Sequence, residues 1–361
     1  MRIAIIMGSD LRNYGGGEKD VIRYSSQLTD KMDITIFSPI GIGEERVSMD
    51  KINVLLKGIN VVWYNGRKLQ LLKDIWTRYR FDLSSFDKVY ATAQGFLLNR
   101  KILNSGAKKT LLGIHTLGAL SDHPVENKLW KRMLYRLIYP LNMHYIKKFD
   151  EIRVQNKDDY QRLKEIGYKG AIWNIPPAMF ADTPEPVVSD KFYGVWVNRV
   201  SPEKRPELLV ELAKLLPDIE FHVIGSGFLD EYYEDMCTLH GISNIIFKGF
   251  ISEEELGKEL QSASFYISTS RGENFGMSAV EAMAYGVPTF AFDVMGLRDH
   301  CTEVVNTILE MVSCIDSIQA TFQTMELSTV FLELKSAIRQ QTLNRFADRV
   351  VIPQIEEMLR E

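Results

Sequence analysis

Residues 268–288 read STSRGENFGMSAVEAMAYGVP, and this stretch decides the fold. A short buried strand is predicted at its start, over Phe265–Ser268, because apolar residues follow one another there. A helix is predicted over Ser278–Tyr285 and a second buried strand over Thr289–Phe292. A strand, a helix and another strand in this order form the repeating unit of a parallel sheet, so the stretch predicts an α/β fold.

Two carboxylates in this stretch lie eight residues apart, Glu273 before the predicted helix and Glu281 inside it. The helix N-terminus at Gly276, Met277 and Ser278 presents backbone N–H groups that have no partner within the helix, and such groups bind diphosphates. Glu281 is then placed to accept hydrogen bonds from a ribose diol, and Glu273 to bind sugar hydroxyls. The alternative is a helix that turns its glutamates to water by coincidence.

Strands and helices alternate on both sides of this stretch. In the second half, strands are predicted over Tyr193–Val197, Glu220–Ile224 and Ile245–Phe247, and helices over Pro206–Leu216, Glu231–His240 and Glu253–Gln261. In the first half, a strand over Arg2–Gly8 and a helix over Glu18–Leu28 are followed by apolar runs at Ile34–Phe37, Val54–Leu56, Lys88–Thr92 and Thr110–Ile114. We therefore expect two doubly wound, Rossmann-like domains that face each other across a cleft.

A proline-rich stretch, Ile175–Pro186, is typical of a linker between such domains. It places the expected boundaries at 1–182 for the first domain and 183–345 for the second, with a C-terminal helix at 346–361 that returns toward the first domain. Two domains also suit a chain of 361 residues with 45% apolar and 25% charged residues.

Other features of the composition concern location. The longest apolar runs fall short of the roughly 20 residues that cross a bilayer. The N-terminus does not resemble a signal peptide, and the three cysteines show no metal-ligand spacing. A reduced, cytoplasmic location is expected. Lys and Arg outnumber Asp and Glu by 29 to 18 in residues 1–180, whereas the remainder has 14 against 29, so the halves differ in charge.

Three further loops follow predicted strands and offer chemistry for phosphates. Gly16 and Gly17 lie in a glycine-rich loop before the first helix, where the backbone approaches an anion closely. Arg199 and Lys204 follow the strand at Tyr193, and both cations suit phosphate oxygens. Gly225 begins a Gly-Ser-Gly turn. Each glycine loop has the alternative of an ordinary turn, and each cation that of a solvated surface charge.

The order of these loops resembles the retaining glycosyltransferases of family 4, which have the GT-B fold. The resemblance is dense between Val195 and Pro288 and looser in the first half. It implies that Arg199 and Lys204 neutralise the departing diphosphate and that Gly16 and Gly17 contact the donor or acceptor. It also implies that the helix amides at Gly276, Met277 and Ser278 bind the diphosphate and that Glu281 binds the ribose. Glu273 and His115 would contact the sugar, and the base would lie near Lys248 and Phe250.

One position departs from the family pattern. Asn198 stands where the family usually has glycine, and its side chain is expected to narrow the cleft near the phosphates. The sequence also lacks any Asp-x-Asp triplet, a common metal site of glycosyltransferases. We therefore expect no metal and no cofactor beyond a UDP- or GDP-linked sugar as donor. Glu273, His115, Arg199 and Lys204 are the expected catalytic residues, and the acceptor is a glycan, a lipid-linked sugar or a small molecule.

Other functions compete with this interpretation. A phosphorylase or a nucleotide-sugar epimerase would use the same fold and release or rearrange the sugar. A non-catalytic sugar-nucleotide binding protein would use the same cations to bind the donor but would not transfer the sugar. A dehydrogenase would need Gly-x-Gly-x-x-Gly after the first strand, which Gly15-Gly16-Gly17 does not match. Diffuse positive charge without a recognisable motif argues against nucleic acid as a partner.

The segment 128–148 is basic and rich in aromatic residues, and it predicts an amphipathic helix. Its apolar positions follow helical spacing at Trp130, Met133, Leu134, Leu137, Ile138 and Leu141. One hypothesis is a helix that rests on anionic lipid headgroups at the cytoplasmic membrane face. The other is a helix that packs this stripe into its own domain.

Overall fold

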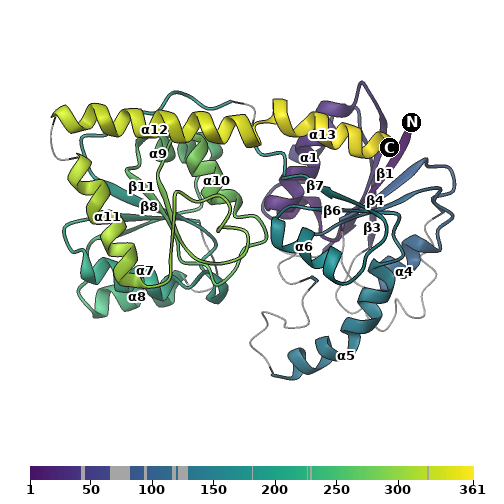
Figure 1. The fold of residues 1–361 in the computed structure, drawn as a ribbon, viewed down its shortest axis with the longest axis horizontal. Helices are drawn as coiled ribbons and strands as arrows, with labels where there is room; N and C mark the ends of the chain where they lie inside the picture. Colours follow the sequence, from purple (N-terminus) through teal and green to yellow (C-terminus); the bar gives the residue numbers. More distant parts are fainter. Residues whose placement is uncertain are drawn as a thin grey trace. The chain divides into compact units, whose positions relative to one another are not determined.

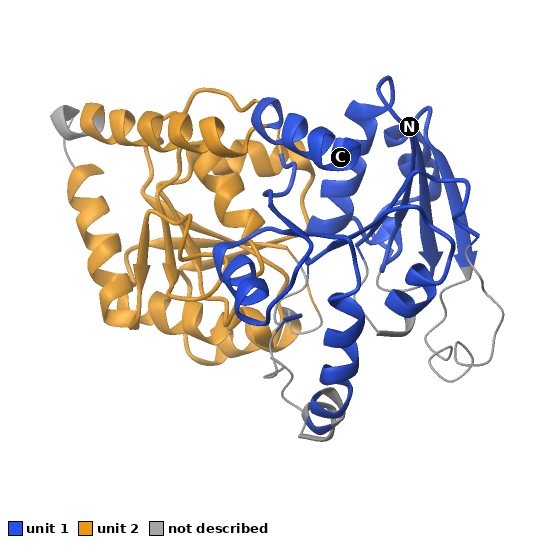
Figure 2. Ribbon diagram, turned by 45° about the vertical axis from the view of Figure 1, so that its right-hand side comes forward, with its two compact units in different colours: residues 1–179, 348–361 blue, residues 180–347 orange. Residues whose placement is uncertain are grey.

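The computed structural model describes residues 1–41, 45–65, 82–92, 96–115, 119–120, 129–180, 182–225, 227, 230–322 and 325–361. It divides the chain into two compact units, shown in separate colours in Figure 2. Unit 1 comprises residues 1–179 and 348–361, and unit 2 comprises residues 180–347. The chain therefore changes unit at Phe180 and at Asp348, where the sequence placed boundaries after residues 182 and 345.

Unit 1 contains a parallel sheet in the order β3-β2-β1-β4-β5-β6-β7 (Figure 1). Its strands are β1 (Arg2–Ile6), β2 (Asp33–Ile40), β3 (Asn60–Asn65), β4 (Lys88–Ala91), β5 (Thr110–Gly113), β6 (Glu151–Val154) and β7 (Ala171–Asn174). Its helices are η1 (Leu11–Asn13), α1 (Gly16–Leu28), α2 (Met49–Leu55), α4 (Phe96–Leu103), α5 (Leu129–Ile146), α6 (Lys157–Glu165) and α13 (Asp348–Arg360).

Two apolar clusters cover the faces of this sheet. One contains residues of α1, α2 and the C-terminal helix α13, and the other contains residues of α4, α5 and α6. The C-terminal helix is therefore part of the core of unit 1, although the whole of unit 2 precedes it in the chain. Helices on both faces explain why β1, β4, β5 and β6 are almost continuously buried.

Unit 2 contains a second parallel sheet, in the order β10-β9-β8-β11-β12-β13. Its strands are β8 (Tyr193–Val197), β9 (Glu220–Ile224), β10 (Ile245–Gly249), β11 (Phe265–Ser268), β12 (Thr289–Phe292) and β13 (Glu303–Val305). Its helices are η2 (Pro202–Lys204), α7 (Pro206–Leu215), α8 (Asp230–Leu239), α9 (Glu253–Ser262), α10 (Met277–Ala284), α11 (Ile308–Phe322) and α12 (Met325–Phe346). Helices α7, α8 and α11 cover one face of this sheet, and α9 and α10 the other.

The two parallel sheets covered by helices confirm the predicted α/β class. In each sheet the strand order reverses once, between β1 and β4 in unit 1 and between β8 and β11 in unit 2. Loops that leave neighbouring strands on opposite sides of such a reversal diverge, and ligands of open α/β sheets bind there. The glycine-rich loop at Gly16 follows β1, and the loops that carry Lys204 and Glu273 follow β8 and β11.

One apolar run of the first half, which we expected to form a strand, lies in a helix instead. The apolar run Val54–Leu56 lies at the end of helix α2, and the strand of this region is β3, a few residues later. The side chain of Ser48 caps α2 by accepting a hydrogen bond from the Lys51 amide at 3.2 Å. This cap favours a helix, whereas the β-branched and aromatic residues of Asn60–Asn65 favour a strand.

Candidate functional site

Lys204 and Glu273 lie together where the strand order of unit 2 reverses. The ammonium group of Lys204 forms an ion pair with the Oε1 atom of Glu273. The hydroxyl of Ser270 donates a hydrogen bond to the same oxygen at 2.7 Å. Both charged side chains are less than one fifth exposed, at 17% and 19%. The structure thus brings together a cation and a carboxylate that the sequence selected separately.

Hydrogen bonds between the two loops hold this pair in place. The hydroxyl of Thr269 donates to the Lys204 carbonyl at 2.6 Å, and the Arg271 amide donates to the Glu203 carbonyl at 2.9 Å. Arg205 donates to the carbonyls of Thr269 at 2.6 Å and Ser270 at 3.1 Å. The two loops therefore form one layer, and a displacement of either changes the geometry of the ion pair.

Arg205 adopts a backbone conformation that few residues other than glycine adopt, with φ of 48°. Its guanidinium group lies 4.7 Å from the centre of the Phe292 ring, in addition to its hydrogen bonds with the β11 loop. These contacts offset the strain of the left-handed conformation. The role of Arg205 could not be predicted from the sequence, because only the folded backbone reveals its conformation.

Arg199, the other predicted cation of this loop, is more loosely held. Its side chain is half-exposed and pairs with Glu203 at 3.3 Å. Burial acts to raise the pKa of the Glu203 carboxyl, but the Ser201 hydrogen bond and the charges of Arg199 and Lys204 outweigh it and lower the pKa. An exposed pair four residues apart contributes roughly 0.5 kcal/mol, so Arg199 can leave Glu203 for an anionic ligand at small cost.

Gly225 allows the loop after β9 to approach the loop after β8. It has φ of 116°, and a Cβ atom there would lie 2.2 Å from the Asn198 carbonyl oxygen. Gly227 is similar, since its Cβ would lie 2.2 Å from the Val200 carbonyl oxygen. Asn198 is itself buried, so the residue that departs from the family pattern lies in the interior of the unit. The observed role of both glycines is close packing of two loops.

Helix α10 begins directly after the β11 loop. Gly276 precedes it with φ of 82°, and a Cβ there would lie 2.3 Å from a methyl group of Leu297. Met277 and Ser278 form the first turn, whose amides lack partners within a helix. Glu281 lies one turn later on the same side as Met277, because residues four apart share a helix face. All three side chains are partly exposed.

Lys248 and Phe250 lie at the end of β10. Lys248 forms an ion pair with Glu259 of α9, and the second oxygen of this carboxylate lies 3.0 Å from Nδ1 of His222. Phe250 is 65% exposed, which is unusual for a large apolar side chain. The charge of Lys248 is therefore engaged within the unit, whereas most of the Phe250 side chain is open to solvent.

The glycine-rich loop of unit 1 is closed by Glu18. Its carboxylate accepts hydrogen bonds from the Gly15 amide at 3.0 Å and from the hydroxyl of Ser9. Gly16 and Gly17 form the first residues of α1, and a Cβ on Gly17 would meet no atom within 4 Å. The open space beside Gly17 lets another group approach the backbone of this helix end.

His115 follows β5 in unit 1, and its Nε2 atom lies 2.8 Å from the hydroxyl of Tyr90 on β4. Burial, together with the charge of Arg153, lowers the pKa of His115 to about 3, against a smaller opposite effect of Gln155. The imidazole is therefore neutral at pH 7. Tyr90 and Arg153 were not predicted, because their relation to His115 depends on strand order.

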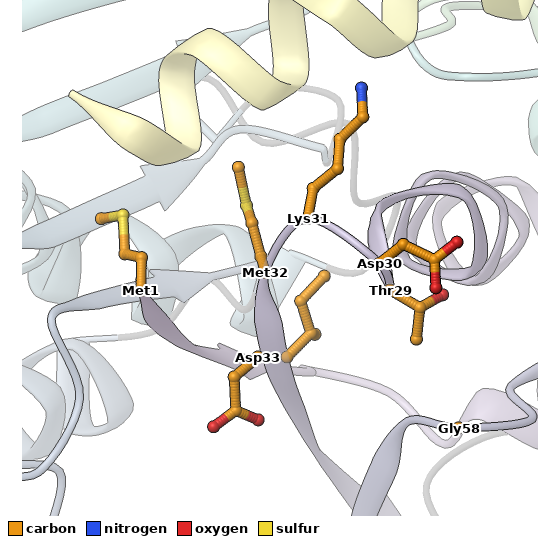
Figure 3. A pocket seen from close by; sticks show the side chains of 8 residues that line it. Met1, Thr29, Asp30, Lys31, Met32, Asp33 and Gly58 are labelled. Carbon is orange, nitrogen blue, oxygen red and sulfur yellow. The ribbon is translucent and has the colours of Figure 1, made fainter.

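A shallow depression of about 400 Å³ lies elsewhere on unit 1 (Figure 3). Its lining residues are Met1, Thr29, Asp30, Lys31, Met32, Asp33, Ile34 and Gly58. It lies at the amino ends of β1 and β2, whereas ligands of open α/β sheets bind at the carboxyl ends. None of the predicted site residues lines it.

Comparison with known proteins identifies the fold and the class of the protein. Residues 181–342, most of unit 2, match the family model of the glycosyl transferases group 1. The fold resembles that of HepE from Anabaena, solved in complex with UDP, with a TM-score of 0.73 at 16% identity over the full length of both chains. This structural likeness confirms the GT-B fold.

Two curated relatives illustrate the similarity in sequence. An uncharacterized glycosyltransferase of Methanocaldococcus jannaschii is 32% identical over 120 residues, which are 33% of this chain and 34% of the relative. The 2-deoxystreptamine N-acetyl-D-glucosaminyltransferase of Streptomyces fradiae is 23% identical over 339 residues, or 82% of this chain and 78% of the relative. The more similar match thus spans about a third of either protein, and these relatives support the glycosyltransferase class.

Proposed function

We propose that the protein is a retaining, metal-independent glycosyltransferase of family 4. It transfers a hexose-type sugar from a nucleotide diphosphate-sugar to a glycan, a lipid-linked sugar or a small molecule. The observation that carries the proposal is the Lys204–Glu273 pair, which lies where the strand order reverses and directly before the N-terminus of α10. A cation, oriented amides and a carboxylate are the groups that a diphosphate and a sugar require.

In this proposal, unit 2 binds the donor. The amides of Met277 and Ser278 bind the diphosphate, Glu281 binds the ribose, and Phe250 lies near the base. The UDP in the solved structure of HepE favours a uridine nucleotide, with GDP as the alternative. Lys204 and Arg199 compensate the charge that develops on the departing diphosphate, a task that metal ions perform in other transferases. The absence of an Asp-x-Asp triplet supports the metal-independent mechanism.

The ion pair suggests how Lys204 and Glu273 act first in the free protein and then with the donor bound. In the free protein Glu273 neutralises Lys204. A bound donor supplies phosphate oxygens for Lys204 and hydroxyl groups for Glu273, and each residue then exchanges one partner for another. Front-face attack, with the leaving phosphate taking the proton of the acceptor, gives retention. Glu273 as nucleophile is the alternative.

Ligand binding tests the donor site. A nucleotide at about 100 times its dissociation constant should stabilise the protein by about 2.7 kcal/mol, read as a shift in thermal unfolding. We expect UDP and UDP-sugars to produce this shift and Glu281→Gln to abolish it. Glu254→Gln, which alters an exposed glutamate of α9, is the matched control. No shift with any UDP or GDP compound would contradict the proposal.

Product analysis separates the proposed reaction from its competitors. A transferase forms a glycoside with an acceptor and keeps the anomeric configuration of the donor. A phosphorylase would consume phosphate, and an epimerase would yield a rearranged sugar without an acceptor. A binding protein would give a thermal shift but no product.

We also propose that α5 contacts an anionic membrane surface. Met133, Leu137 and Leu141 occupy one stripe of this helix and are 62%, 78% and 42% exposed. Arg136 and the two lysines that follow the helix are exposed as well. Apolar side chains flanked by cations suit the boundary between lipid headgroups and acyl chains. Side chains of 128–132 and of 134 and 135 lie outside the described residues, so they carry no part of this proposal.

Vesicle binding tests the membrane contact. No helix among the described residues is long and apolar enough to span a bilayer. We expect binding to vesicles that contain anionic lipid, none to neutral ones, and release by high salt. Leu137→Glu should abolish binding, whereas Leu239→Glu, at an 82% exposed leucine of unit 2, should not. Equal binding by the two variants would refute the contact.

A further inference from the structure

A buried network in unit 1 ends at His115. Arg153 on β6 and Asp20 on α1 form an ion pair of 3.0 Å, and both side chains are fully buried. The same guanidinium group donates to the carbonyls of Ile175 at 3.1 Å and Pro176 at 2.5 Å. It also donates to the hydroxyl of Tyr90 at 3.3 Å, and this hydroxyl contacts His115. Four residues from four parts of the chain thus form one series of contacts, in which Tyr90 connects a buried ion pair to the imidazole.

The direction of these hydrogen bonds follows from the chemistry of the groups. A guanidinium group only donates, so the Tyr90 oxygen is the acceptor in its contact with Arg153. Burial raises the pKa of Tyr90 to about 12, so the phenol keeps its own proton. Among the described residues, the Tyr90 hydroxyl has one further hydrogen-bond partner besides Arg153, and this partner is Nε2 of His115. Tyr90 therefore donates to Nε2, and Nε2 must be the unprotonated nitrogen.

Gly113 shows that the contact is built closely. A Cβ atom at this position would lie 2.3 Å from Nε2 of His115 and 2.6 Å from the hydroxyl oxygen of Tyr90. Any side chain there would force the two groups apart. Glycine at position 113 of β5 therefore leaves room for the hydrogen bond between Tyr90 and His115.

We propose that Asp20, Arg153 and Tyr90 are positioning residues that hold His115 as a neutral imidazole with its hydrogen on Nδ1. His115 then meets its ligand as a hydrogen-bond donor through Nδ1, not as a general base. Nδ1 is buried and has no hydrogen bond of ideal geometry with the described residues, but the Gln155 side chain acts on the ring as a weak hydrogen-bond partner and raises its pKa. A ligand that meets Nδ1 would therefore replace Gln155 or share this contact with it. A buried donor of this kind suits an acceptor oxygen such as a sugar hydroxyl.

The role of each positioning residue differs. Arg153 prevents the Tyr90 hydroxyl from turning its hydrogen elsewhere, because it occupies an acceptor site of that oxygen. Asp20 neutralises Arg153, and its second oxygen accepts from the Ala178 amide at 2.7 Å, which keeps the carboxylate oriented. The charge of Arg153 also disfavours a charged imidazole nearby. The choice of sugar as ligand rests on the proposed function, whereas the tautomer rests on the network alone.

The tautomer is measurable in the free protein. Selective ¹⁵N labelling of histidine gives distinct signals for protonated and unprotonated ring nitrogens, and His115→Gln assigns the signals of His115 among the six histidines. We expect a protonated Nδ1 and an unprotonated Nε2 at pH 7. A protonated Nε2 in the wild-type protein would overturn the proposal and leave the proposed function untouched.

Two tyrosine variants complete the test. Tyr90→Phe should mix the two tautomers and lower kcat/KM about tenfold, the usual effect of one lost hydrogen bond. Tyr24→Phe is the matched control, because Tyr24 is buried beside the same guanidinium group but its hydroxyl makes no hydrogen bond among the described residues. It should leave the His115 signals unchanged. An unchanged tautomer in Tyr90→Phe would also overturn the proposal, whatever the activity of the wild-type protein.

Discussion

The two units support their candidate residues by different means. In unit 2 the Lys204–Glu273 pair is partly exposed and is held by hydrogen bonds between two neighbouring loops. In unit 1 His115 contacts the Tyr90 hydroxyl, which accepts a hydrogen bond from an ion pair that is completely shielded from water. The Lys204–Glu273 pair keeps some exposure, so ligand groups can replace each partner, whereas the fully buried pair cannot open without leaving a charge in the interior.

This difference separates two tasks. The groups that we propose to neutralise a departing diphosphate must change partners during a reaction cycle, so they lie at the surface of the site. A residue that acts only by presenting one hydrogen in one direction needs a support that does not change. Variants in unit 1 should therefore affect stability first, and variants in unit 2 should affect rate first.

The largest effect is expected from Asp20→Asn. The substitution keeps the shape of the side chain but leaves the charge of Arg153 uncompensated in the interior, which typically costs about 3–5 kcal/mol. Urea unfolding, with hydrogen exchange of the β1 and β6 amides, measures the loss in unit 1. Glu203→Gln, which removes the exposed partner of Arg199, should cost less than about 1 kcal/mol. An equal loss of unfolding free energy in Asp20→Asn and Glu203→Gln would contradict the proposed difference between the units.

The next largest effect concerns rate. Lys204→Ala should lower the turnover of donor by about 100- to 1000-fold, equivalent to about 3–4 kcal/mol, because an electrostatic contact to the developing charge is lost. Arg199→Ala should lower it by the same order. Lys258→Ala removes an exposed ion pair on α9 and should leave turnover unchanged. A loss below about threefold in either site variant would count against its assignment.

An effect that is smaller for each pH unit is expected from a change in pH. The folded protein holds the pKa of His115 at about 3, below its ordinary value of 6.5. As the pH falls from about 6.5, the unfolded chain binds a proton that the folded protein does not, so stability declines by up to about 1.4 kcal/mol per pH unit until pH 3. His115→Gln should flatten this dependence in urea unfolding. His144→Gln, at an exposed histidine of α5, should keep the wild-type slope.

The smallest effect isolates backbone strain in unit 2. Arg205→Gly and Arg205→Ala both lose the hydrogen bonds to Thr269 and Ser270, so both should reduce turnover alike. Alanine is strained in the left-handed backbone conformation, whereas glycine is not. The free energy of unfolding of Arg205→Ala should therefore be about 1 kcal/mol lower than that of Arg205→Gly. Equal stabilities would show that this loop relaxes when the guanidinium contacts are removed.

Much of the fold could be predicted from local patterns. Short apolar runs separated by helical segments indicate parallel sheets, and the turn before Met277 together with Glu273 and Glu281 predicts a ligand-binding loop. The run Val54–Leu56 misled the prediction because three apolar residues fit the end of a helix as well as a strand. The exposed stripe on α5 was also open to two interpretations, because helical spacing does not say which neighbour covers a face.

The sequence by itself determined the α/β class and the candidate residues of each loop, because short-range patterns specify strands, turns and helix starts. Tertiary structure alone decided which of them meet. Lys204 and Glu273 are 69 residues apart, and Arg153 and Asp20 are 133 apart. Such pairs form only when the order of strands in the sheet brings their loops together, and that order depends on packing over the whole unit.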